Sequence, residues 1–129
     1  MLTVRIFSFS YLYNGIPKDE TPNGGGFVFD CRYIYNPGKK DKFRELTGKD
    51  DAVIKFLDEN SEMQNMLDDV FDIIDSAVQI YFERNFTNLM ISFGCTGGQH
   101  RSVYAAEKLN EYLSNKYSNI KTELKHFNI

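Results

Sequence analysis

The sequence predicts an α/β domain in which helices pack on a small parallel or mixed sheet of about four strands. Short β-rich segments alternate with longer segments whose apolar residues recur at three- and four-residue steps. One of these strands runs into a glycine-rich loop and then into a helix. The chain has 129 residues, the length of one average domain, so we expect a single domain over residues 1–129.

Composition and charge exclude several classes of protein. With 42% hydrophobic and 26% charged residues, the chain is too apolar for a disordered polypeptide and too polar for a membrane protein. The net charge of -3 provides no global positive field, so nucleic acid could bind only at a local patch. Cys31 and Cys95 lack metal-ligand spacing, and residues 1–8 do not resemble a signal peptide. We therefore expect a reduced, cytoplasmic protein without metal, cofactor or membrane contact.

The first third of the chain predicts two strands separated by loops. Residues 3–10 are β-rich and predict the first strand. Residues 11–26 contain two prolines and a Gly-Gly-Gly run, which predict a long, mobile loop. Residues 27–29 are a short apolar run bounded by Asp30, suited to a strand buried on both faces. Residues 33–48 predict a second irregular connection with one helical turn.

Two helices follow. Asp50 or Asp51 can cap a short helix through Leu57, and a longer helix is predicted from Ser61 to about Arg84. The longer helix carries an apolar stripe suited to packing against a sheet, formed by Met63, Met66, Leu67, Val70, Ile74, Ala77, Val78 and Tyr81. Its acidic residues are expected to be solvated on the other face: Asp68, Asp69, Asp72 and Asp75.

The last third carries the strand, loop and helix on which the functional prediction depends. Residues 88–93 form the clearest strand, followed by the loop 94–102. The next helix has one apolar face, made of Val103, Ala106, Leu109 and Leu113. Residues 121–127 alternate enough to predict a final strand, with His126 near its end.

The loop reads G-C-T-G-G-Q-H-R-S from Gly94 to Ser102 and is typical of an anion site. Backbone amides and the positive end of the helix dipole meet there, and Gly97 and Gly98 permit close approach to a phosphate. Further donors come from the side chains of Thr96, His100, Arg101 and Ser102. The loop lacks the Walker A lysine and the G-x-G-x-x-G order. We therefore predict a site for a phosphorylated small molecule; a turn that only connects two elements is the alternative.

A catalytic interpretation also stays open. Cys95, five residues, Arg101 and Ser102 match the C-x5-R-[ST] pattern of cysteine-dependent phosphatases, in which a thiolate attacks phosphorus. Asp30 would be the candidate general acid. Gly94 stands where those enzymes usually have histidine. The sequence therefore favours binding without chemistry, and a small residue that only fills space is a third interpretation of Cys95.

Further motifs, in the same order as in one known family, extend over nearly the whole chain. V-F-D-x-R is present at 28–32, N-P at 36–37 and L-T-G at 46–48. Together with the loop at 94–102, these motifs resemble the C-terminal domain family of the RNase adapter protein RapZ. The P-loop domain that precedes this module in full-length members has no counterpart in the sequence.

The resemblance implies ligands and partners. It implies binding of an amino-sugar phosphate such as glucosamine-6-phosphate, or of a nucleotide, and an adapter role toward RNA or protein. The phosphate side of the pocket would be residues 96–102, faced by Asp30, Arg32 and Asn36. RNA would need local cations, and Lys39, Lys40, Lys42 and Arg44 are either that footprint or a solvated surface. Ser8-Phe9 and Gly15-Ile16-Pro17 resemble the family's opening motif, but Leu12 stands where a lysine would be expected, which removes cationic character from the rim. The oligomeric state stays open.

Overall fold

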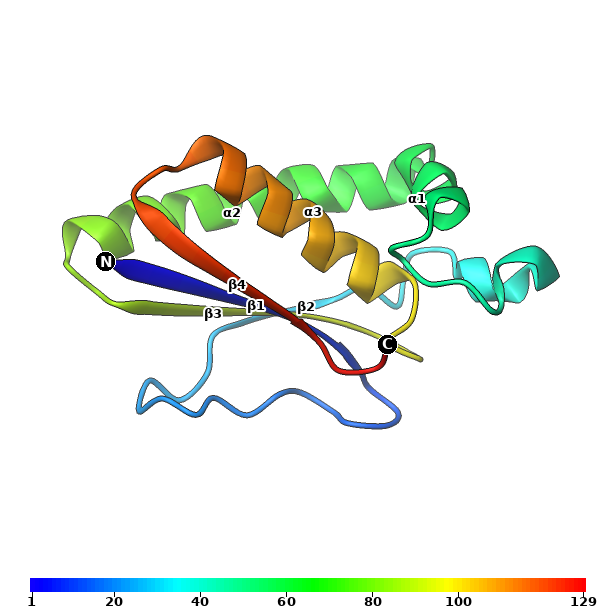
Figure 1. Ribbon diagram of the computed structural model, residues 1–129, viewed down its shortest axis with the longest axis horizontal. Helices are drawn as coiled ribbons and strands as arrows, with labels where there is room; N and C mark the ends of the chain where they lie inside the picture. The colour runs from blue at the N-terminus through cyan, green and yellow to red at the C-terminus, as the bar shows by residue number, and fades with distance from the viewer.

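The computed structural model describes residues 1–129 without interruption, and helices follow strands in the order that the sequence predicts (Figure 1). The strands are β1 (Leu2–Ser10), β2 (Phe27–Asp30), β3 (Asn88–Cys95) and β4 (Ile120–His126). The helices are α1 (Asp51–Asp58), α2 (Ser61–Glu83) and α3 (Arg101–Lys116). Two single 3-10 turns, η1 (Pro37–Lys39) and η2 (Asp41–Phe43), lie in the second irregular connection. No helix is both long and apolar enough to cross a membrane.

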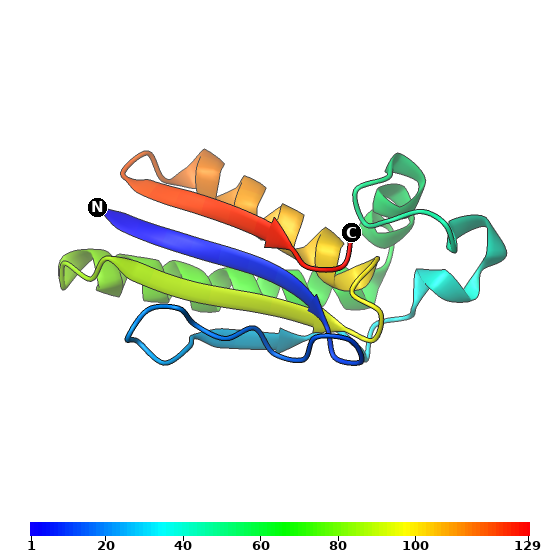
Figure 2. The same cartoon turned by 60° about the horizontal axis from the view of Figure 1, so that its bottom comes forward.

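The sheet has four strands in the order β2-β3-β1-β4, and every neighbouring pair is parallel. In register, Ile6 of β1 lies between Ile91 of β3 and Leu124 of β4. Because all strands run the same way, their carboxyl ends meet at one edge of the sheet (Figure 2). This is the edge where ligands bind in open α/β sheets.

All three helices lie on one face of the sheet (Figure 1). Helix α3 packs on β1, β3 and β4, while α1 and α2 pack against each other and α3. The core between the layers is apolar, and Val4, Ile6, Ile74, Ile91 and Leu109 are completely buried. The helix periodicity therefore predicts the face of α2 that is buried.

Only the loop 11–26 covers the opposite face of the sheet (Figures 1 and 2). The prediction that β2 is buried on both faces is therefore wrong, since Val28 is 39% exposed. Strand β2 lies at an edge of the sheet and its outer face meets only this loop. Its apolar composition reflects stacking of Phe29 against Phe27 and Phe93 on the helix side.

The loop 11–26 is fastened to the sheet, in contrast to the mobile loop that its composition predicts. Asp19 accepts hydrogen bonds from the Thr21 amide and hydroxyl, the Gly25 amide and Nη2 of Arg5. The Thr21 amide contributes most to holding the pKa of Asp19 well below its usual range, outweighing the effect of burial. The Arg5 contact ties the loop to the middle of β1.

Helix α2 begins at Ser61 as predicted, and its cap is Asn60, whose Oδ1 accepts from the Met63 amide at 2.8 Å. Asp50 precedes α1 as predicted, but its carboxylate accepts from the Thr47 amide and makes no cap bond to the helix.

Asp75 is not solvated. Its carboxylate accepts from the hydroxyls of Tyr112 and Tyr117 and from Nζ of Lys116, joining α2 to the end of α3. Burial opposes ionisation, but these hydrogen bonds outweigh it and lower the pKa of Asp75.

Candidate functional site

The loop 94–102 lies at the carboxyl edge of the sheet, where it joins β3 to the start of α3 (Figure 2). Thr96 is exposed and Gly97 is half-buried, so this part of the loop faces solvent. Gly98, His100, Arg101 and Ser102 are buried. The exposed backbone at the start of the loop is therefore followed by buried polar side chains.

In this loop the backbone amides are unpaired, whereas several backbone carbonyls accept hydrogen bonds. None of the amides from residue 96 to residue 103 donates a hydrogen bond within the chain. The carbonyls of Cys95, Gln99 and His100 accept from backbone amides, and that of Thr96 accepts from the Ser10 hydroxyl. His100 occupies the cap position of α3 but its side chain makes no cap bond. The helix therefore begins with the unsatisfied donors that commonly bind an anion.

Arg101 is the buried cation of the site. Its side chain is 4% exposed, and Nη1 donates to the carbonyls of Arg32 and Ile34 at 2.9 and 2.8 Å. Nε is buried without a partner. One side of the guanidinium thus fixes the segment after β2, while a donor on the other side is unsatisfied, which costs free energy unless a ligand or water pairs with it.

Gln99 and His100 hold the segment that contains η1 and η2. Nε2 of Gln99 donates to the carbonyls of Arg44 and Leu46, and Nε2 of His100 lies 2.8 Å from the Phe43 carbonyl. Their side chains are therefore positioning groups in this structure, although the sequence predicts direct contact with the ligand.

Steric contacts explain why two positions of the loop are glycine. Gly98 has a φ of +68°, and a Cβ there would lie 2.6 Å from Oδ1 of Asn128. A Cβ at Gly94 would lie 2.3 Å from Cζ of Phe9, so no side chain fits where phosphatases usually have histidine. Nothing lies within 4 Å of a Cβ at Gly97.

The facing residues of the predicted pocket are paired with each other. Asp30 and Arg32 form an ion pair with an Nη2–Oδ2 distance of 2.7 Å, and each side chain is about half exposed. This hydrogen-bonded pair lowers the pKa of Asp30. The Arg32 guanidinium also stacks 3.8 Å from the Tyr11 ring centre. Asn36 caps η1 by accepting from the Gly38 amide.

Cys95 is buried within the apolar core, with its Sγ atom 3.1 Å from the Ser102 hydroxyl. Cys31 is also buried, and burial raises the pKa of its thiol. Neither thiol is presented to the solvent side of the loop, as a nucleophile would need to be.

Comparison with known proteins identifies the family. The family model described as the RapZ C-terminal domain matches residues 2–129. The chain belongs to the RapZ C-terminal domain family. A nucleotide-binding protein of Acinetobacter baylyi is 36% identical over 128 residues, which cover 98% of this chain and 43% of that protein.

Other relatives carry the same description. A nucleotide-binding protein of Nitrosomonas eutropha is 42% identical over 108 residues, 84% of this chain and 35% of its own. One of Listeria monocytogenes is 38% identical over 117 residues, 91% of this chain and 38% of its own. The RapZ C-terminal domain described here therefore spans about two fifths of the length of these relatives.

A chain of polar side chains that the sequence does not predict lies at the same edge of this RapZ C-terminal domain. The Ser8 hydroxyl lies 2.6 Å from Nδ1 of His126, and Nε2 of His126 lies 2.7 Å from the Glu107 carboxylate. Asn128 lies next to Gly98, and its Oδ1 is buried without a partner. The long separation along the chain hides these contacts, and only the position of His126 near a strand end could have indicated them.

The basic residues lie together on the segment held by Gln99 and His100. Lys39, Lys40, Lys42 and Arg44 are all exposed. Nζ of Lys40 lies 5.9 Å from the Tyr35 ring centre and 5.7 Å from that of Phe56. The segment thus presents cations beside partly exposed aromatic rings.

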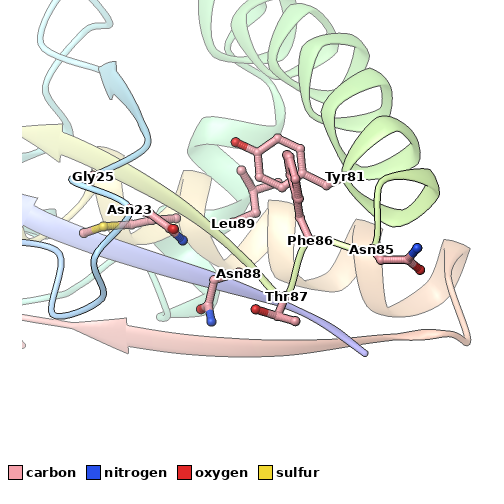
Figure 3. A pocket seen from close by; sticks show the side chains of 9 residues that line it. Asn23, Gly25, Tyr81, Asn85, Phe86, Thr87, Asn88 and Leu89 are labelled. Carbon is pink, nitrogen blue, oxygen red and sulfur yellow. The ribbon is translucent and has the colours of Figure 1, made fainter.

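A cavity of about 400 Å³ lies near the amino edge of the sheet, away from the loop (Figure 3). Asn23, Asn85, Asn88, Tyr81 and Phe86 contribute to its wall. None of its lining side chains is charged, and Oδ1 of Asn88 already accepts from Nε of Arg5. This cavity therefore has no cation to offer a phosphate.

Proposed function

We propose that this RapZ C-terminal domain binds a phosphorylated small molecule at the loop 94–102 and performs no chemistry on it. The phosphoryl group would accept from the unpaired amides of residues 96–103 and from Nε of Arg101. The hydroxyls of Thr96 and Ser102 are the nearest further donors in the sequence. The ligand would be a nucleotide or an amino-sugar phosphate such as glucosamine-6-phosphate.

The buried, unpaired Nε of Arg101 carries this proposal. A guanidinium that only held the segment after β2 would need no more than its two carbonyl bonds. Its position at the first residue of α3 adds a full charge to the partial charge of the helix end. The name of the relatives as nucleotide-binding proteins supports the same class of ligand.

The burial of Cys95 favours binding over phosphoryl transfer. In the cysteine-dependent alternative, Cys95 would attack phosphorus, Arg101 would bind the phosphate and Asp30 would protonate the leaving group. The hydrogen bond from Arg32 instead lowers the pKa of the Asp30 carboxyl, which disfavours the protonated form that a general acid needs.

Titration calorimetry tests the proposal with inorganic phosphate, adenine and guanine nucleotides, and glucosamine-6-phosphate. We expect at least one to bind, and Arg101→Lys to weaken binding about tenfold or more because the lysine cannot supply the guanidinium fork. Arg84→Lys makes the same exchange at an exposed arginine at the end of α2 and is the matched control. Absence of binding by the wild-type chain, or equal effects of both variants, would contradict the proposal.

Adapter function toward RNA is a second candidate, favoured by the exposed cations at Lys39, Lys40, Lys42 and Arg44. Fluorescence anisotropy with a structured RNA should show affinity that falls steeply with salt and weakens when these residues are changed to glutamine. Binding that does not depend on salt, or none at all, would exclude the RNA role and leave a protein partner.

A further inference from the structure

The cavity near the amino edge of the sheet differs in its chemistry from the loop 94–102. Its volume of about 400 Å³ lies within the usual range of small-molecule sites. No charged side chain lines it, whereas amides, a hydroxyl and two aromatic rings do (Figure 3). Such a lining selects uncharged ligands, because an ion would lose part of its hydration there without gaining a charged partner.

The end of helix α2 fixes the aromatic wall of this cavity. Asn85 follows the helix with a φ of +58°, and the Phe86 amide donates to the Tyr81 carbonyl at 2.9 Å. A left-handed residue followed by such a hydrogen bond ends a helix along a defined backbone path. The Tyr81 and Phe86 rings meet edge to face, with their centres 5.1 Å apart. Phe86 is 47% exposed, so the pair leaves part of this ring uncovered.

Arg5 joins a second wall of the cavity to the sheet. Its Nη2 atom donates to Asp19 of the loop 11–26, and its Nε atom donates to Oδ1 of Asn88. The loop also lies directly on β3 at Gly26, where a Cβ would collide with a backbone carbonyl of that strand. Both walls are therefore held in place without a ligand, which lowers the entropic cost of binding one.

The polar side chains of the lining are free to bind a ligand. The amides of Asn23 and Asn85 and the hydroxyl of Thr87 make no hydrogen bond within the chain. Asn88 uses only its oxygen, so its Nδ2 atom keeps two donors. A side-chain amide both donates and accepts, as a ligand hydroxyl does, so the two groups pair well. These side chains belong to three elements: the loop 11–26, the end of α2 and the start of β3.

These features fit a sugar ring better than a planar base. Bases bind by stacking on aromatic faces, but the planes of Tyr81 and Phe86 cross at 86° and form no parallel slot. A sugar ring presents C–H groups on a face and hydroxyls around its edge. The negative face of an aromatic ring attracts C–H groups, and amides on three elements match hydroxyls that point in several directions.

We propose that this cavity binds an uncharged saccharide, with the sugar ring against Phe86 and its hydroxyls on the amides of Asn23, Asn85 and Asn88. No residue of the loop 94–102 lines the cavity, so this inference is independent of the proposed phosphoryl site. The domain thus carries two ligand sites of different chemistry at opposite edges of one sheet.

Nuclear magnetic resonance titration of the whole chain tests this site, because it locates binding even when affinity is low. The probes are glucose, galactose and N-acetylglucosamine, with adenosine for a base and inorganic phosphate for an ion. We expect at least one sugar to shift the side-chain amide signals of Asn23, Asn85 and Asn88, with a Kd of about 1 mM for a ligand of this size. Phosphate should leave these signals unchanged, because no cation lines the cavity.

Two substitutions separate the contribution of the ring from that of an amide. Phe86→Ala should weaken sugar binding about fivefold, since it removes the aromatic face. Phe82→Ala is the matched control, because Phe82 is 46% exposed on α2 but does not line this cavity, and it should have no effect. Asn85→Gly suits the left-handed backbone and removes only the side-chain amide, so it should weaken binding without unfolding the domain.

Several outcomes would overturn the proposal. One is that none of the three sugars shifts these signals at concentrations far above the expected Kd. Another is that the shifts map to other residues, or that Phe86→Ala and Phe82→Ala affect them equally. If adenosine alone produces the shifts, the cavity belongs to a base and the assignment to a saccharide is wrong.

Discussion

Replacing Gly98 by alanine should destabilise the domain, whereas the same change at Gly97 should not. Gly98 has a φ of +68°, which costs a residue with a Cβ about 1–2 kcal/mol. The new Cβ would also lie 2.6 Å from Oδ1 of Asn128, which must move. We therefore expect Gly98→Ala to cost about 2 kcal/mol, and Gly97→Ala less than about 0.5 kcal/mol since nothing lies within 4 Å of its Cβ.

Thermal unfolding followed by circular dichroism measures this difference. For a domain of this size, about 2 kcal/mol corresponds to a fall in Tm of roughly 8 °C. The two variants also separate stability from binding, because a Cβ at Gly97 would enter open space on the loop that the ligand is proposed to use. Gly97→Ala should thus weaken phosphate binding at unchanged Tm. Equal melting of Gly98→Ala and wild type would refute the reasoning about the loop backbone.

Three further predictions concern buried polar groups and thiols. Asp75→Asn should lower stability by about 2 kcal/mol at neutral pH, because it loses charge-assisted hydrogen bonds to α3. The folded pKa of Asp75 is lowered, so its contribution is present above its unfolded pKa of about 4 and is lost as pH falls through the folded value. Urea unfolding of both proteins at neutral and acid pH should show the gap closing; a gap independent of pH would contradict this. Tyr104→Phe should cost about 1 kcal/mol in the same assay, since its buried hydroxyl bonds Asp58 at 2.5 Å, and no change would mean that water replaces this bond. Cys31 and Cys95 should react with a thiol reagent only in denaturant, and rapid labelling of native Cys95 would revive the phosphatase alternative.

The elements of the fold are predictable because their signals are local. Periodicity in α2, the apolar run of β3 and the glycine loop all lie within short windows of sequence. The single parallel sheet follows from the alternation of these elements. Which face of β2 is buried does not follow, since that depends on an edge position that only the assembled sheet defines.

The place of the loop 94–102 in the fold is predictable, but the contacts of each side chain are not. The strand, glycine loop and helix pattern predicts that these residues join β3 to α3, and the structure agrees. The carbonyl contacts of Gln99, His100 and Arg101 join the loop to residues more than fifty positions earlier, and no local pattern reports them. The same is true of the contacts of Asp75 and His126, which depend on where α3 packs.

The position of β1 has a consequence for how the chain acquires its structure. This first strand lies inside the sheet, where Leu2 aligns with Ile120, at the opposite end of the sequence. Closing so large a loop costs conformational entropy before the contacts between the two strands stabilise the structure. Domains of this topology are therefore slow to fold. During synthesis, one side of β1 has no partner until β4 (Ile120–His126) has been made. Refolding should accordingly be limited by docking of the final strand.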